Sequence, residues 1–339
     1  MAVIRVSNLR KRFNLEAGFF APFGHFVYAV NGVSFFIEKN ETYGLVGESG
    51  CGKTTTARLL VRMYECDEGD ITFQDGLDVR RLKRGDLKRY RERVKYVFQD
   101  PARSLNPRKS VYEVLVSGYR WASSGESPWP GKRRAREEAA AALEEVGLGA
   151  ADLERRPAEF SGGQRQRISI ARGLLLKPDL LICDEVVSAL DVSIQGQILN
   201  LLLDIRSRRS LSFLFIAHDL KVACYFCDRI GVMYRGELME EAPAAELYKN
   251  ALHPYTKLLF SSAVGSGLKE EGAGTAGPGL TPGEVKTAVT ELLGCAFAER
   301  CPLAEERCFR EHPELRELGS GSEEGKGPSQ RVRCFKVLP

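Results

Sequence analysis

A short glycine-rich stretch contains the residue types that bind the phosphates of a nucleotide. It runs from Gly47 to Thr54 with the sequence GESGCGKT, which fits the pattern G-x-x-x-x-G-K-[ST]. Glycines allow the backbone to wrap around phosphate groups, so that successive N–H groups point at negative charge. In this pattern Lys53 reaches the β- and γ-phosphates, and the Thr54 hydroxyl binds Mg²⁺. The residues expected to contact the nucleotide here are Gly47, Glu48, Ser49, Gly50, Cys51, Gly52, Lys53, Thr54 and Thr55.

Two adjacent carboxylates follow an apolar run farther along the chain. The run Leu180–Cys183 is followed by Asp184 and Glu185. Charged side chains at the end of a buried strand are costly unless they meet a cation or take part in chemistry. We therefore expect Asp184 to hold Mg²⁺. Glu185 points to the other side of the strand, and we expect it to act as the general base for the water that attacks the γ-phosphate.

A third motif, Ser161-Gly162-Gly163-Gln164, lies between the first two and precedes an amphipathic helical pattern. A serine hydroxyl and free N–H groups at a helix N-terminus form a second anion site. The chain therefore offers two phosphate-binding helix ends, and the sequence leaves open whether both hold the same nucleotide.

From Val3 to about Val264, apolar runs alternate with helical patterns, which is typical of an α/β core. Helices are expected to begin after the phosphate loop, over 55–63, and to cover 132–146 within a helical insertion. Residues 265–283 are rich in Gly, Thr and Pro and favour a linker or mobile loop. The expected strands are Tyr43–Val46, Val94–Phe98, Asp179–Cys183, Phe213–Ala217 and Ile230–Tyr234.

Length and composition favour a two-domain protein with a large core. The chain has 339 residues, of which 43% are apolar, and this exceeds one average domain. Its net charge of +4 is close to balance and does not by itself indicate a nucleic-acid partner. No apolar run reaches the length of about 18 residues that a membrane-spanning helix needs, and the N-terminus lacks a signal-peptide pattern. The nine cysteines, an odd count, favour reduced thiols or metal ligands over disulfides.

The order and spacing of the motifs are similar to those of the ATPase subunits of ABC transporters, and the resemblance covers nearly the whole chain. It is carried by the phosphate loop, Gln99, Ser161–Gln164, Asp184-Glu185, Ser188–Asp191 and His218.

This resemblance implies a role for each matching residue. Gln99 resembles the glutamine that touches Mg²⁺ and the attacking water, and His218 resembles the histidine that contacts the γ-phosphate. Ser161–Gln164 resemble the signature, which binds the γ-phosphate held by the opposite subunit, and Asp191 lies at the same dimer seam. Phe13 occupies the position of the aromatic ring that stacks on adenine. The implied catalytic residues are Glu185, His218 and Gln99, and the implied Mg²⁺ site consists of Thr54, Gln99 and Asp184.

Other segments resemble the ATPase subunits of oligopeptide/dipeptide-type importers. They are Val97–Arg108, Val187–Gln195, His253–Thr256 and the cysteine-rich tail. Phe160 in place of the commoner signature leucine, together with the long insertion 14–27, favours the second, F-type ATPase subunit of such systems. The sequence departs from that group at Val186, where Pro is usual, and over 265–293.

The tail contains Cys295-x₅-Cys301-x₆-Cys308 and then Cys334. This spacing differs from that of common zinc sites and of ferredoxins. Spacing alone allows a four-thiolate site, zinc or another metal, or free thiols. The resemblance implies that these four cysteines ligate a [4Fe–4S] cluster.

The resemblance implies an α/β fold: an ABC ATPase core with a RecA-like parallel sheet, an antiparallel β subdomain and a helical insertion, plus a small Cys-rich extension. We expect the ATPase domain at 1–264, with its helical subdomain at about 101–172, a linker at 265–293 and the metal-binding extension at 294–339.

The implied function is ATP hydrolysis coupled to uptake of peptides or related solutes. The implied partners are a homologous ATPase subunit in a heterodimer, two transmembrane permease subunits and an external solute-binding protein, without nucleic acid. The implied location is the cytoplasmic face of the membrane, as a peripheral subunit. The alternatives are an importer of the same group for nickel or an oligosaccharide, and a soluble ABC ATPase that acts on nucleic acid.

Overall fold

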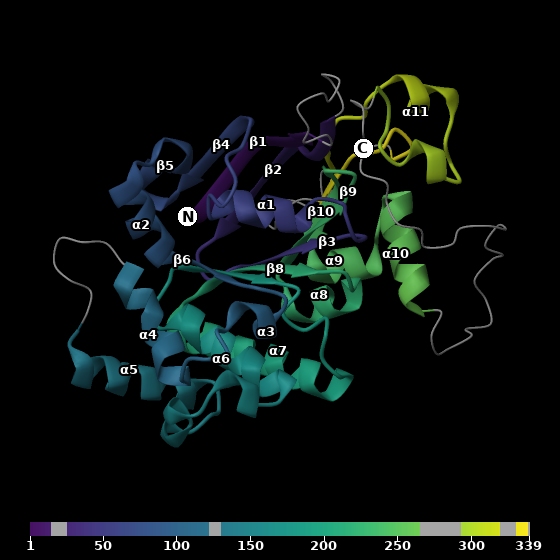
Figure 1. Ribbon diagram of the computed structural model, residues 1–339. Helices are drawn as coiled ribbons and strands as arrows, with labels where there is room; N and C mark the ends of the chain where they lie inside the picture. The colour runs from purple at the N-terminus through teal and green to yellow at the C-terminus, as the bar shows by residue number, and fades with distance from the viewer. Residues whose placement is uncertain (15–25, 122–129, 265–292, 319–329, 338–339) are drawn as a thin grey trace.

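A computed structural model of the protein describes residues 1–14, 26–121, 130–264, 293–318 and 330–337 (Figure 1). The insertion 14–27 and the linker 265–293 expected from the sequence lie almost entirely outside these described residues. Within the described parts of the chain, each helix is too short or too polar to cross a lipid bilayer.

The central sheet contains five neighbouring parallel strands in the order β9-β3-β8-β7-β6. Every residue of β3, β7, β8 and β9 is buried, which explains why these strands are continuous apolar runs in the sequence. The strands are β3 (Thr42–Val46), β6 (Val94–Val97), β7 (Leu180–Asp184), β8 (Ser212–Ala217) and β9 (Arg229–Tyr234). The strands predicted from the sequence are thus confirmed to within one residue at each end.

An antiparallel sheet packs against one face of the central sheet and has the order β2-β1-β4-β5. Its strands are β1 (Ala2–Asn14), β2 (Phe26–Glu38), β4 (Glu68–Phe73) and β5 (Leu77–Asp78). One hydrophobic core joins Val6 and Phe35 of this sheet to Leu45 of β3 and to Leu60 of helix α1 (Lys53–Leu60). The helix after the phosphate loop therefore lies between the two sheets.

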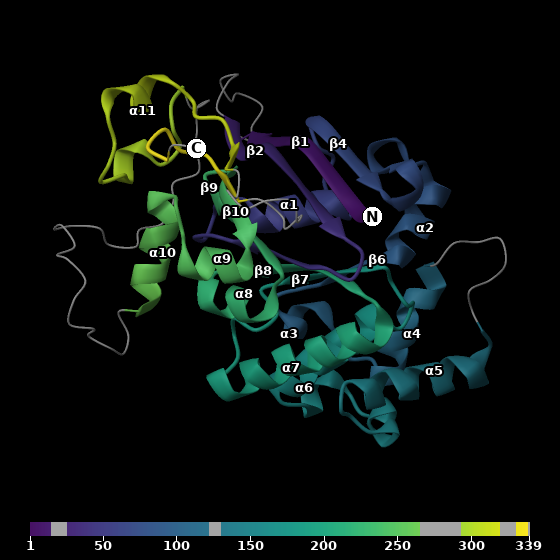
Figure 2. The same ribbon diagram turned by 180° about the vertical axis from the view of Figure 1, so that it is seen from behind.

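The other face of the central sheet is covered by helices, as Figures 1 and 2 show from opposite sides. The second core joins Ile168 and Leu174 to Phe213 and Phe215 of β8. The remaining α-helices are α2 (Arg84–Arg93), α3 (Pro101–Ser104), α4 (Val111–Trp121), α5 (Lys132–Glu145), α6 (Gly162–Leu174), α7 (Val192–Arg209), α8 (Leu220–Phe226), α9 (Ala244–Lys249), α10 (Pro254–Val264) and α11 (Glu306–Arg310). The short 3₁₀ helices are η1 (Gln74–Gly76), η2 (Val79–Arg81), η3 (Ala150–Glu154), η4 (Pro157–Glu159) and η5 (Ala298–Arg300). The predicted helix 132–146 and the helical insertion are both present.

The C-terminal extension adds strands to the central sheet. Strand β12 (Gln330–Val332) pairs antiparallel with β10 (Glu237–Pro243), and β11 (Arg316–Leu318) pairs with β12. Glu237 of β10 is buried and contacts His312, while Glu240 accepts a hydrogen bond of 2.7 Å from Gln330. The extension therefore adds polar partners to these buried carboxylates, which also accept hydrogen bonds from Asn31 and from the backbone N–H groups of Leu252 and His253.

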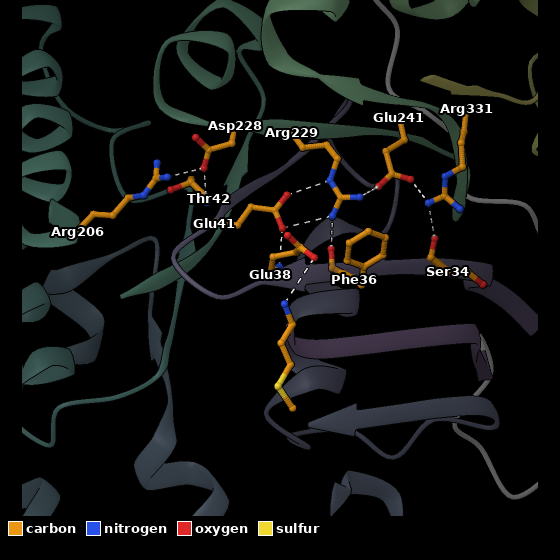
Figure 3. A network of polar contacts seen from close by, with 11 residues as sticks. Ser34, Phe36, Glu38, Glu41, Thr42, Arg206, Asp228, Arg229, Glu241 and Arg331 are labelled. Atoms are coloured by element: carbon orange, nitrogen blue, oxygen red, sulfur yellow. Dashed lines mark hydrogen bonds and ion pairs between the residues drawn. The ribbon is translucent and has the colours of Figure 1, made fainter. Parts of the chain in front are cut away.

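A network of ions connects the extension to both sheets (Figure 3). Arg331 of β12 pairs with the buried Glu241 and donates to the carbonyl oxygen of Ser34 on β2. Arg229 at the start of β9 lies 3.3 Å from Glu241 and 2.9 Å from Glu41. These contacts lie at the end of the central sheet where the parallel strands β3 and β9 begin, because Arg229 is the first residue of β9. The phosphate loop follows the last residue of β3 and therefore lies at the opposite end of the sheet.

Candidate ATP-binding and hydrolysis site

The phosphate loop connects β3 to α1, and two of its glycines are required by close backbone contacts. A Cβ atom at Gly47 would lie 2.2 Å from the carbonyl oxygen of Met233. Gly52 has a φ of 108°, and a Cβ there would lie 2.2 Å from the carbonyl oxygen of Ala29. Residues with side chains cannot occupy either position without shifting the neighbouring strand.

Lys53 provides a buried positive charge at the floor of this loop. Its Nζ donates to the carbonyl oxygens of Gly47 at 2.7 Å and Glu48 at 3.0 Å, and the side chain is only 4% exposed. The first turn of α1 contains no acidic residue, so the positive end of the helix dipole is not neutralised there. Both features attract the phosphates of a nucleotide.

Two of the three predicted Mg²⁺ ligands, Thr54 and Asp184, lie in direct contact. The Thr54 hydroxyl donates to Asp184 Oδ1 at 3.0 Å, and the Tyr96 hydroxyl donates to Asp184 Oδ2 at 2.5 Å. Burial, and then the neighbouring Asp184 carboxylate, raise the pKa of Tyr96, so its hydroxyl remains a neutral donor. Hydroxyl and carboxylate oxygens suit Mg²⁺. Tyr96 could not be predicted as a partner of Asp184, because nothing local in the sequence shows that β6 lies beside β7.

Gln99, Glu185 and His218 gather near the ends of β6, β7 and β8. Gln99 Nε2 donates to Glu185 Oε2 at 2.7 Å. Glu185 and His218 both line a small cavity of about 40 Å³ together with Ser188. Glu185 has a φ of 48°, a left-handed conformation that is strained for a residue with a side chain and that often marks functional sites. The arrangement can place a water between a carboxylate and a bound γ-phosphate.

Ser161 caps the N-terminus of helix α6, which packs on the helix-covered face of the central sheet. Its hydroxyl accepts from the Gln164 N–H at 3.3 Å, while Gln164 Oε1 accepts from the Ser161 N–H at 3.0 Å. This reciprocal capping leaves Ser161 and Gln164 exposed. Helix α6 belongs to the core on the helical face, whereas α1 belongs to the core between the sheets. Ser161–Gln164 and the phosphate loop are thus attached to helices that pack in different cores.

Asp191 and Phe13 lie on the edges of the site. Asp191 is exposed at the residue before α7, and its side chain makes no capping hydrogen bond to that helix. The Phe13 ring is half-buried at the end of β1, with its centroid 5.3 Å from that of Tyr64 in an edge-to-face arrangement. Lys11 Nζ lies 5.4 Å from the same ring centroid. The proposed contacts of Asp191 with a second subunit and of Phe13 with adenine stay predictions.

A larger cavity of about 730 Å³ opens beside Gln99, between β6 and the helical insertion. Its lining includes Tyr96, Phe98 and Gln99 on one side and Leu115 and Arg172 on the other. Because Gln99 lines this cavity and also donates to Glu185, a group that fills the cavity can influence the Glu185 carboxylate.

The four cysteines of the extension converge from separate segments. The Cys295 N–H donates to the Cys308 carbonyl oxygen at 2.8 Å. Burial raises the pKa of Cys295 to about 11, and the negative potential of Cys308, Cys334 and Cys301 adds to this increase. However, in the described ranges no three His, Cys, Asp or Glu side chains lie close enough together to hold a single metal ion. The predicted metal site is therefore not confirmed.

Two family models match the chain. Residues 30–188 match the model described as ABC transporter, and residues 239–308 match the C-terminal region of oligopeptide/dipeptide transporters.

The chain is also similar to two transport proteins of Bacillus subtilis strain 168. It is 41% identical to the oligopeptide transport ATP-binding protein AppF over 98% of this chain and 96% of AppF. It is 47% identical to the oligopeptide transport ATP-binding protein OppF over 74% of this chain and 80% of OppF. Among solved structures, the dimeric ATP-binding cassette MJ0796 bound to ADP and Pi matches 71% of this chain and 98% of that chain, with 25% identity and a TM-score of 0.62. Motifs, fold and relatives agree: the chain belongs to the family of ABC transporter ATP-binding subunits.

Proposed function

We propose that this chain is the ATP-hydrolysing subunit of an importer for peptides or related solutes. The observation that carries this proposal is the 41% identity to an oligopeptide transport ATP-binding protein over nearly the full length of both chains, extension included. The order of segments supports an ATPase domain at 1–264, a linker at 265–293 and an extension at 294–339.

The geometry supports a role for Lys53, Thr54, Asp184, Glu185 and Gln99 in binding and hydrolysing ATP. Lys53 and the loop N–H groups bind the phosphates of ATP, and Thr54 with Asp184 would hold Mg²⁺. When bound, Mg²⁺ neutralises charge that develops on the β- and γ-phosphates. Glu185 accepts a proton from the water that attacks the γ-phosphorus, while the bond from that phosphorus to the bridging oxygen of ADP breaks. Gln99 orients the Glu185 carboxylate through their hydrogen bond.

A second ATPase subunit is needed to complete each site. Helix α6, which follows Ser161, and helix α1, which follows the phosphate loop, pack in different cores, and this supports a signature that binds a γ-phosphate held by another subunit. We propose that this partner is a homologous ATPase subunit and that Asp191 lies in the seam between the two. Light scattering tests this: the full chain should associate in an ATP-dependent way with its partner, and constant association without nucleotide would count against the proposal.

The cavity of about 730 Å³ beside Gln99 supports docking of a permease segment. It opens between the sheet and the helical insertion, and its lining mixes Phe98 and Leu115 with the cation Arg172. Such a docked segment would place the chain at the inner face of the membrane as a peripheral subunit. Replacing Arg103, an exposed residue of the same lining, by Glu should release the chain from membranes that contain the permeases, while ATP binding by the free chain is retained.

We also propose that Cys295, Cys301, Cys308 and Cys334 hold a [4Fe–4S] cluster. Thiolates are the ligands of iron–sulfur clusters, and the resemblance to importer ATPases favours a cluster at these four positions. Besides burial, Cys308, Cys334 and Cys301 all raise the pKa of Cys295, which supports a grouping of the four thiols in the extension. Protein purified without oxygen should be brown, with roughly four irons per chain. Stoichiometric zinc, or no metal at all, would overturn the cluster assignment.

The transport function is tested with the assembled importer. The chain, its partner ATPase and the permeases are reconstituted in vesicles with a binding protein, and uptake of labelled peptides, nickel and an oligosaccharide is compared. Peptide uptake that requires ATP supports the proposal. Uptake of only nickel or only the oligosaccharide would leave the ATPase assignment intact and refute peptides as the solute.

A further inference from the structure

The C-terminal extension makes a direct ionic contact with the phosphate loop. Arg300, the last residue of η5, forms a two-pronged pair with Glu48 of the loop. Its Nη1 lies 2.7 Å from Glu48 Oε2, and its Nη2 lies 3.0 Å from Glu48 Oε1. Only 21% of the Arg300 side chain and 15% of the Glu48 side chain are exposed. Two parallel charge-assisted hydrogen bonds with little solvent access form a strong and directional contact.

An aromatic cluster fixes the position of both partners. The rings of Tyr234, Tyr255 and Phe297 pack against one another, with centroids 4.7–5.3 Å apart. The Arg300 guanidinium lies 5.7 Å from the Tyr234 ring centroid and 5.9 Å from that of Phe297. The Tyr255 hydroxyl accepts the backbone N–H of Glu48 at 3.0 Å. The backbone of Glu48 is thus held by Tyr255, and its side chain is held by the extension.

The charge on Glu48 explains why this contact matters for ATP. Glu48 is part of the loop that receives the triphosphate, and its carbonyl oxygen already accepts from Lys53. A carboxylate without a partner at this position would repel the phosphates, and the repulsion would be strong because the site is half-buried. The Arg300 guanidinium neutralises that charge, and the hydrogen bonds hold the loop in one conformation. Pairing with Glu48 also raises the pKa of Arg300, so the positive charge is permanent.

We propose that Arg300 is a positioning residue for ATP binding, which acts through Glu48 and thereby makes the C-terminal extension part of the nucleotide site. Arg300 precedes Cys301 directly, so the fold of the cysteine-rich segment determines where the guanidinium lies. This role rests on the proposed function only in that ATP is the bound nucleotide. It does not depend on which solute is imported.

Equilibrium binding of Mg·ATP to the full-length chain tests the proposal, with a fluorescent ATP analogue displaced by unlabelled ATP. We expect Arg300→Ala to raise the Kd for ATP roughly tenfold, as for loss of one partly screened charge pair. Arg300→Lys, which keeps the charge but not the two-pronged geometry, should recover part of the affinity. Arg310→Ala is the matched control, since Arg310 lies in the same extension and pairs only with the exposed Glu306 in the described structure. Its Kd should equal that of the wild type.

A double-mutant cycle separates this role from a merely structural one. In the background of Glu48→Gln the carboxylate is absent, so Arg300→Ala should change the Kd by less than about twofold. Equal losses in both backgrounds, or no loss in the wild-type background, would overturn the proposal. Arg300→Gln is measured in parallel, because its planar amide can still pack on Tyr234 if the alanine variant does not fold. At saturating ATP, Arg300→Ala should lower the rate of ATP hydrolysis by the assembled transporter by a smaller factor than it lowers the affinity for ATP. This should hold whichever solute is transported.

Discussion

Arg331→Ala should destabilise the protein by removing a partner from the buried Glu241. Breaking a buried ion pair from one side costs about 3–5 kcal/mol, because the remaining charge is left uncompensated. Arg331 is 27% exposed, and Glu241 keeps Arg229 at 3.3 Å, so we expect a smaller loss of about 2 kcal/mol. For a chain of this size the loss corresponds to a decrease of about 3 °C in Tm.

Scanning calorimetry measures this loss against a matched control. Arg316→Ala is suitable, because Arg316 is exposed on the neighbouring strand β11. This control should melt within about 1 °C of the wild type, as exposed substitutions usually do. Adding Glu241→Gln to Arg331→Ala should recover part of the stability, since the second change removes the unpaired charge. If Arg331→Ala melts together with Arg316→Ala, the extension is not held to β10 by this ion pair.

Further predictions concern catalysis and pH. Glu185→Gln should hydrolyse ATP at least about a hundredfold more slowly while still binding it, and it should hold the ATPase dimer closed; near-normal turnover would exclude Glu185 as the base. Burial lowers the pKa of His253 to about 3, below the unfolded value near 6.5, so His253 contributes stability above pH 6.5 that is lost as the pH falls toward 3. Between pH 6.5 and 5 the wild type should therefore lose about 2 kcal/mol more than His253→Asn, whose side chain can still accept the Tyr255 N–H. Equal pH slopes for the two proteins in urea unfolding would refute this.

The sequence was sufficient for those parts of the fold that depend on local pattern. Phe213–Ala217 is a continuous apolar run because β8 is covered on both faces, and the phosphate loop is recognisable because its glycines meet close backbone contacts. Thr54 and Asp184 could be paired in advance only because their motifs have known roles, and their hydrogen bond agrees with that expectation.

Contacts that depend on tertiary packing could not be predicted. Tyr96 reaches Asp184 because β6 pairs with β7, and local pattern does not reveal the order of strands. Arg300 and Glu48 are 252 positions apart in the sequence. The sequence around an arginine does not show whether its side chain is buried or exposed, so this pair could not be predicted. The strand Gln330–Val332 is only three residues long, so its pairing with β10 gave no periodic signal.

The most direct test of the proposed function is uptake of a labelled peptide by the reconstituted importer, measured together with ATP hydrolysis. We expect peptide-loaded binding protein to accelerate hydrolysis and to drive uptake in the wild type, and Glu185→Gln in this chain to abolish or strongly reduce both. Hydrolysis that does not respond to peptide, with no ATP-dependent uptake, would contradict the assignment of this chain to peptide import.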